Sequence, residues 1–374
     1  MKLLKISLLL AILITTTGCW DQNFLSKTSL AFSLGFDKGN DPKNPLELIT
    51  IIRALKPASA GEIQPYNTSY KVKGASPLIL REKMNEITPG VFSINKLSNV
   101  IIGADLAKSE IYPLLDVLYR DAKSNVSAKI VVTKGRAKDL LKEEYLKGTL
   151  ISKALKDLLD SAESHSVIPE QSLASIMPAM FDPGQDFVLP YVEKIDDKLI
   201  KVRGVALFDK LSYTGKNLIG EDASLYLLMV GKEGAYTQFT VNNPKKEKGI
   251  DQKVSFFVRV NKHKIKLKIM DSKPVYSVSL KLKVSVAEYT KGLLKQDEIK
   301  TLEKHISKEL TKQAKKVTDL LIDSDCDALA LGRKLMIKDP KLFDQLQKNG
   351  MLDLKNVEIQ PTVKVKVVDN GILD

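Results

Sequence analysis

The side chains that most often bind metals or act as nucleophiles are scarce in this chain of 374 residues. It has three histidines, His165, His263 and His305, which lie in a predicted loop, a predicted hairpin turn and a predicted helix. No two of them have a spacing that brings both rings onto one face of an element, as a zinc site requires. We therefore expect no metal centre, and we expect His305, which precedes Ile306, to lie at the surface or at the edge of the core.

The stretch DSDCD, residues 323 to 327, is the best match to a calcium loop. Its acids fall at positions 1, 3 and 5 of a loop that begins at Asp323. However, position 6 holds Ala328 where Gly is needed, and position 12 holds Lys334 where a bidentate Glu is needed. The stretch fits a helix start better, in which one of these aspartates accepts hydrogen bonds from the first backbone amides.

Signatures of covalent catalysis are absent from the sequence. It contains no GxSxG turn, and Cys326 has no histidine at the spacing of a catalytic motif. The Gly-Lys pair in TGKNLIGEDAS, residues 214 to 224, lacks the upstream Gly and the following Ser or Thr of a phosphate-binding loop. We expect a protein that is not an enzyme and uses no cofactor.

The first 18 residues have the order of a secretory signal, in which lysines precede an apolar run from Leu8 to Ile14 and small residues follow it. The run is too short for a bilayer core that needs roughly 20 apolar residues. Its end, TTTGCW, resembles a bacterial lipoprotein signal. We therefore expect cleavage before Cys19, lipid on its sulfur, and Trp20 at the membrane interface.

The formal net charge is +13, and removal of the signal with Lys2 and Lys5 leaves 13 − 2 = +11. Such an excess favours anionic neighbours, which for an exported protein are lipid headgroups or wall polymers rather than nucleic acid. Basic side chains gather on the predicted C-terminal strands, where they form either a solvated face or a docking face for an anionic partner. This face comprises Arg259, Lys264, Lys266, Lys268, Lys281, Lys283, Lys364 and Lys366.

Alternating apolar residues predict a C-terminal sheet of four strands, largely antiparallel and apolar on one side. The first two strands would form a hairpin around an Asn261-Lys262-His263 turn. Residues 295–322 carry an apolar stripe at helical spacing, and we expect this helix to cover the sheet, although a coiled-coil partner is the other use of such a stripe. The strands are expected at residues 254–260, 265–269, 276–286 and 357–367.

The N-terminal half reads as strands that alternate with helices, which suggests some parallel pairing between residues 96 and 148. A connection-rich stretch near residue 200 suggests a domain boundary. We predict a multidomain fold of mixed α/β and α+β type. Residues 1–18 are the signal, residues 19–200 a mixed α/β region that can divide into two subdomains, and residues 201–374 an α+β domain.

Several segments share their order with one known family. GCWD at residues 18–21 directly follows the lipoprotein signal, residues 96–141 give a strand, Gly, Ala-Lys, helix and second strand in succession, and residues 203–232 place a Gly-Val-Ala strand before an acidic turn and a helix. Together they resemble the C-subunit lipoproteins of bacterial spore germinant receptors. The C-terminal block of that family is matched at Asp327, Gly332, Pro340 and Gly371.

The resemblance implies a non-enzymatic lipoprotein subunit of a nutrient germinant receptor, held by Cys19 on the outer face of the spore inner membrane. It implies two integral membrane subunits as partners, with which the protein would trigger germination. A solute-binding lipoprotein of a transporter is the alternative, and it would need two similar lobes with a ligand cleft.

Overall fold

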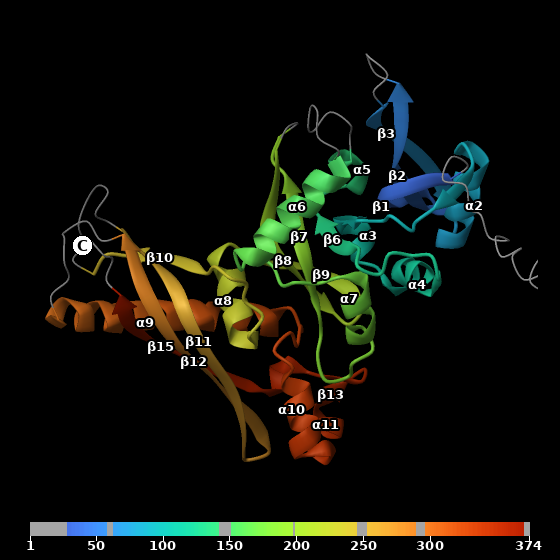
Figure 1. Ribbon diagram of the computed structural model, residues 1–374. Coiled ribbons are helices and arrows are strands. Elements are labelled where there is room, and N and C mark those ends of the chain that lie inside the picture. Colours follow the sequence, from blue (N-terminus) through green and yellow to red (C-terminus); the bar gives the residue numbers. More distant parts are fainter. Residues whose placement is uncertain are drawn as a thin grey trace, which may run out of the picture.

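The computed structural model describes residues 28–57, 63–141, 151–196, 199–244, 253–288 and 296–369. Within these ranges the strands form sheets of nine, four and two strands, with helices packed on the two larger sheets (Figure 1). The predicted fold of mixed α/β and α+β type is therefore confirmed.

The larger sheet has the order β3-β2-β1-β5-β6-β7-β8-β9, and β4 also pairs with β1. Its central strands β1, β5, β6 and β7 are parallel, as predicted for the β5-to-β6 unit, and the outer pairs are antiparallel. Its strands are β1 (Thr28–Asp41), β2 (Asn44–Pro57), β3 (Ile63–Gly74), β4 (Val91–Ser93), β5 (Asn99–Gly103), β6 (Lys129–Thr133), β7 (Val188–Lys194), β8 (Ile200–Asp209) and β9 (Ser212–Ile219).

Helices cover both faces of this sheet because its central strands are apolar on both sides. In β5, Val100 and Ile102 join one core, whereas Ile101 joins the other. The first core includes α2 (Pro77–Ile87), α4 (Tyr112–Arg120) and α7 (Leu173–Ala179). The second includes α5 (Ala137–Leu140), α6 (Ile151–Ser164) and α8 (Glu221–Val230), while the short α3 (Ala104–Ala107) follows β5.

The smaller sheet has the order β10-β11-β12-β15, from β10 (Gln238–Asn242), β11 (Lys253–Met270), β12 (Lys273–Glu288) and β15 (Glu358–Asp369). β10, β11 and β12 are antiparallel, whereas β12 and β15 are parallel. The predicted turn at residues 261–263 is wrong, since β11 continues unbroken to Met270 and the hairpin turn follows at Asp271 and Ser272.

A β-bulge explains that error. Val258 pairs with Val284 and Val260 with Lys283, so β11 contains one extra residue, Arg259. The extra residue shifts the alternation by one position, which lets the apolar side chains on both sides of it face the same core without a turn. In the sequence alone, a change of phase of this kind looks like the end of a strand.

The long predicted helix is present as α9 (Gln296–Asp323), with Leu302, Ile306 and Leu310 among its buried residues. Besides packing on the sheet, α9 forms hydrogen bonds with the free edge of β15. The side chains of Glu303, Ser307 and Thr311, one per helical turn, accept hydrogen bonds from the backbone N–H groups of Val367, Val365 and Val363 at 2.8 to 3.0 Å. α9 therefore covers an edge that would otherwise present unpaired backbone donors.

One hydrophobic core joins the two larger sheets, because Leu225 and Leu228 of α8 share it with β12 and α9. The larger sheet itself extends past residue 200 through β8 and β9, and the domain division near that residue stays a prediction. The remaining elements are α10 (Leu331–Lys338), α11 (Pro340–Leu346), β13 (Gln347–Lys348), β14 (Met351–Leu352) and the 3-10 turn η5 (Leu354–Asn356).

Candidate functional site

The predicted lipidation residue Cys19 and its neighbour Trp20 lie outside the described residues, which begin at Thr28. Their roles therefore stay predictions. Among the helices of the described ranges, none is both long and apolar enough to cross a bilayer.

The basic residues predicted on the C-terminal strands lie on three neighbouring strands of the smaller sheet. The seven lysines of that set lie exposed on the outer face of β11, β12 and β15, opposite the face that α8 and α9 cover. Arg259 is the bulge residue, and its guanidinium lies 5.7 Å from the ring centre of Phe257. Sequence reasoning missed Lys262 because it placed this residue in a turn. We define the lysine face as Lys262, Lys264, Lys266, Lys268, Lys281, Lys283, Lys364 and Lys366.

Strand register places several of these like charges directly side by side. Lys262 pairs with Lys281, which pairs in turn with Lys364, so that one row across three strands consists of lysine alone. Lys283 and Lys366 form a second adjacent pair. Within the described residues, none of the eight lysines has an ion-pair partner.

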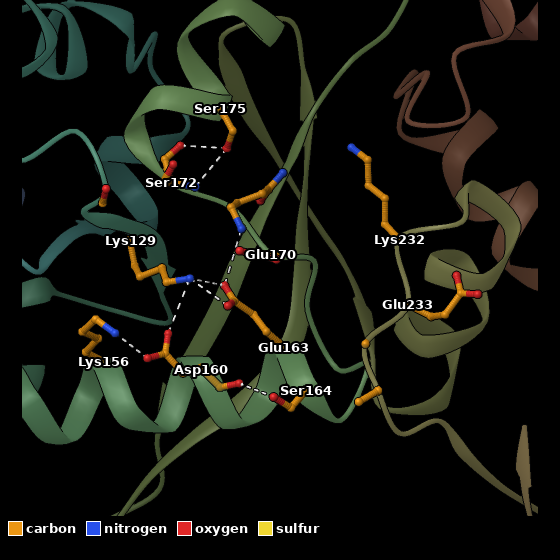
Figure 2. A pocket seen from close by; sticks show the side chains of 14 residues that line it. Lys129, Lys156, Asp160, Glu163, Ser164, Glu170, Ser172, Ser175, Lys232 and Glu233 are labelled. Atoms are coloured by element: carbon orange, nitrogen blue, oxygen red, sulfur yellow. Dashed lines mark hydrogen bonds and ion pairs between the residues drawn. The ribbon is translucent and has the colours of Figure 1, made fainter. Parts of the chain in front are cut away.

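A polar pocket of about 750 Å³ lies elsewhere, between the α6 end of the larger sheet and the loop that follows α8 (Figure 2). On one wall, the ammonium of Lys129 lies 2.7 Å from both carboxylate oxygens of Glu163 and 3.5 Å from Asp160. The side chains of Lys129 and Glu163 are each 12% exposed. Burial raises the pKa of Glu163, while Lys129 opposes that shift.

The opposite wall carries Lys232 and Glu233, which Figure 2 shows across the gap from Glu163. The two walls are tied together beside the pocket, because Ser166 accepts a hydrogen bond from the N–H of Gly234 at 2.9 Å and donates one to the carbonyl of Tyr236. Gly234 is required there, since a Cβ at this position would lie 2.0 Å from the carbonyl oxygen of Glu163.

The pocket offers ammonium groups, carboxylates and hydroxyls, but no activated nucleophile. Ser172 and Ser175 hydrogen-bond each other in a capping box at the start of α7, and the Ser164 hydroxyl donates to a backbone carbonyl. None of the described serines that line the pocket bonds to a carboxylate or an imidazole, which is the arrangement that serine catalysis needs.

A second constellation is buried where α10 meets the larger sheet. Asp327 accepts hydrogen bonds from the amides of Leu331 and Gly332 at 2.8 and 2.7 Å, so the prediction that an aspartate of DSDCD caps this helix is confirmed. Asp186 in turn accepts from the amides of Asp327 and Lys210, at 2.7 and 2.8 Å. Two buried carboxyl groups from distant parts of the chain are thereby linked.

Burial perturbs every ionisable group in this constellation. Desolvation raises the pKa of Asp186 to about 6, although its two backbone hydrogen bonds oppose the shift. The pKa of Asp327 is also raised, by burial and by the charge of Asp186. Burial likewise raises the pKa of the fully buried Cys326, so its thiol stays protonated and unreactive.

The three histidines have different surroundings. His165 stacks on Tyr236, His263 points at Gly231 from within β11, and His305 on α9 contacts the carbonyl of Asn242. Across the described ranges, no three acidic, histidine or cysteine side chains are grouped as metal ligands.

Comparison with known proteins shows which family the chain resembles. A family model of the spore germination protein N-terminal domain matches residues 21–194, and a family model described as spore germination B3/GerAC-like, C-terminal, matches residues 203–371. Spore germination protein GerQC of Bacillus cereus is 22% identical over 96% of both chains. Spore germination protein KC of Bacillus subtilis is 21% identical over 92% of this chain and 90% of its own.

A solved structure agrees with the fold. The crystal structure of the GerBC protein superimposes with a TM-score of 0.55 over 91% of this chain and 99% of its own, at 16% identity. Because both family models match and together span most of the chain, the protein belongs to the GerAC-like family of spore germination proteins, as the resemblance of its segments predicted.

Proposed function

We propose that this protein is the peripheral lipoprotein subunit of a nutrient germinant receptor, and that it acts with two integral membrane subunits to trigger germination. The observation that carries the proposal is the pair of family matches, residues 21–194 and 203–371, which together leave little of the mature chain unmatched. The role is one of assembly and signalling rather than catalysis, which fits a pocket without an activated nucleophile.

The anchor in this proposal is a lipid on Cys19. Burial of each methylene of an acyl chain contributes about 0.8 kcal/mol, so two or more chains hold a protein firmly on a bilayer. Tethering raises the local concentration of the folded domains beside membrane partners. The protein would lie on the outer face of the spore inner membrane, with Trp20 at the interface.

The test is to replace the anchor and then restore it by other means. We expect Cys19→Ala protein to move from the membrane fraction to the soluble fraction when the membranes are washed at high salt, which screens electrostatic contacts but does not release a lipid anchor, and we expect spores that carry it to germinate slowly in nutrients. A second variant, Cys19→Ala with an N-terminal transmembrane helix added, should regain both properties. Normal membrane localisation and normal germination with Cys19→Ala alone would contradict the proposal.

A further inference from the structure

The lysine face carries a charge pattern that folding itself does not explain. Like charges that lie directly opposite on neighbouring strands destabilise a sheet. Nevertheless, Lys262, Lys281 and Lys364 occupy one row, and Lys283 and Lys366 occupy another. No acid of the described residues pairs with them. An anionic surface laid on this face would remove the repulsion.

No acidic residue lies between the lysines on this face of the described strands. Residues that point outward from β12 and β15 between the lysines are Ser277, Ser279, Gln360 and Thr362, which are neutral. The carboxylates on this face lie at the ends of the strands and accept hydrogen bonds from neutral neighbours: Glu358 from Gln360 at 2.7 Å, Asp369 from Ser285 at 3.1 Å, and Glu288 from Ser255 at 3.3 Å. The face is therefore positive over three neighbouring strands.

Apolar side chains are exposed beside the lysines. Val260 shares the row of Lys283 and Lys366 and is 39% exposed, and Val368 on β15 is 49% exposed. Met270, at the tip of the β11–β12 hairpin, is 57% exposed. Figure 1 shows this hairpin projecting beyond α9. A broad cationic surface with interspersed apolar groups suits the headgroup region of a bilayer, where both kinds of side chain are stabilised.

We propose that the lysine face lies against anionic phospholipid headgroups. Each Lys near an anionic bilayer contributes about 1 kcal/mol, and the attraction is lost beyond a Debye length. The eight ammonium groups would fix the C-terminal domain flat on the membrane, as a second contact besides the N-terminal lipid. The choice of a bilayer as occupant rests on the proposed function, which places the protein beside one.

The experiment measures binding of the full chain to vesicles by sedimentation, with Cys19→Ala as the background so that no lipid is attached. Binding to neutral phosphatidylcholine vesicles measures any insertion by the apolar residues 8–14. The additional binding to vesicles that also contain phosphatidylglycerol measures the electrostatic contribution. We expect the second kind to bind more strongly, with an excess that falls as salt is raised.

Two variants that each lose four lysines show whether the lysine face itself causes the binding to anionic vesicles. Replacement of Lys281, Lys283, Lys364 and Lys366 by Gln should weaken binding to anionic vesicles roughly fivefold per lysine, the ratio that about 1 kcal/mol gives. The control replaces Lys300, Lys304, Lys308 and Lys312, exposed on α9, and changes net charge equally. The control should bind almost as the parent does.

Equal weakening in both variants would overturn the proposal, because net charge rather than the lysine face would then cause the binding. Absence of any preference for phosphatidylglycerol would overturn it too, and face-dependent binding to poly-aspartate in that case would point to an acidic protein surface instead. Since no lipid is attached in this assay, its failure leaves the proposed anchoring at Cys19 untouched, and the Cys19 test leaves this one untouched.

Discussion

Raising the pH from 4 to 7 should lower the stability of the folded protein through Asp186. Asp186 is 6% exposed, and burial raises its pKa from the ordinary 3.8 to about 6. Between these values the folded state keeps a proton that the unfolded state has lost. The free energy of unfolding therefore falls as the pH rises through this window, and it levels off above about pH 7.

The expected size follows from the shift. A difference of about two pKa units, at about 1.36 kcal/mol per unit, gives roughly 3 kcal/mol for this one group. Asp327 shifts in the same direction, whereas Asp116 and Glu193 have lowered pKa values and act oppositely. The contribution of Asp186 must therefore be taken as a difference between two proteins.

The comparison is between the parent protein and Asp186→Asn, by urea unfolding followed with circular dichroism from pH 4 to pH 7.5. Asn loses one hydrogen bond at every pH, but it has no proton to release. The variant should thus gain about 2 to 3 kcal/mol relative to the parent between pH 4 and pH 7.5, because part of the unfolded-state ionisation is already complete at pH 4. Asp105→Asn, at a carboxylate whose side chain is 79% exposed, is the control and should show no such trend. A difference that is constant with pH, or that grows the other way, would refute the reasoning.

Three further substitutions test packing and pairing. Lys129→Met should destabilise the protein by about 3 kcal/mol in chemical unfolding, because it leaves the largely buried carboxylate of Glu163 without its cation. Adding Glu163→Gln should recover part of the loss. Gly234→Ala should lower the melting temperature, because the added Cβ forces the loop after α8 away from α6 at a cost of about 1 to 3 kcal/mol. An unchanged melting temperature would show that the loop and the helix are not in tight contact. Ser307→Ala should cost about 1 to 3 kcal/mol and speed hydrogen exchange at the amide of Val365, whereas Ser307→Thr, which keeps the hydroxyl, should not.

Local periodicity was enough to predict α9 and the strands it covers. Leu302, Ile306 and Leu310 recur at helical spacing, and the alternation in β12 is unbroken from Val278 to Val284. The bulge at Arg259 was not predictable in this way, because one extra residue changes the phase of the pattern just as a turn does. The register that places Lys262 beside Lys281 follows from that bulge.

The pocket and the buried carboxyl pair depend on contacts between residues far apart in sequence. Asp327 could be predicted as a helix cap because its partners are four and five residues away. Asp186 lies 141 residues from the amide that it binds, and no local pattern marks it. The same holds for the pocket, whose walls come from α6 and from the loop after α8.

The central claim is that this protein works as one subunit of a membrane receptor, and affinity capture tests it most directly. The tagged full chain would be isolated from detergent-solubilised spore inner membrane, and the proteins that accompany it would be identified by mass spectrometry. We predict that two integral membrane germinant-receptor subunits are recovered in constant proportion to it. Recovery of transporter components, or of no reproducible membrane protein, would contradict the claim.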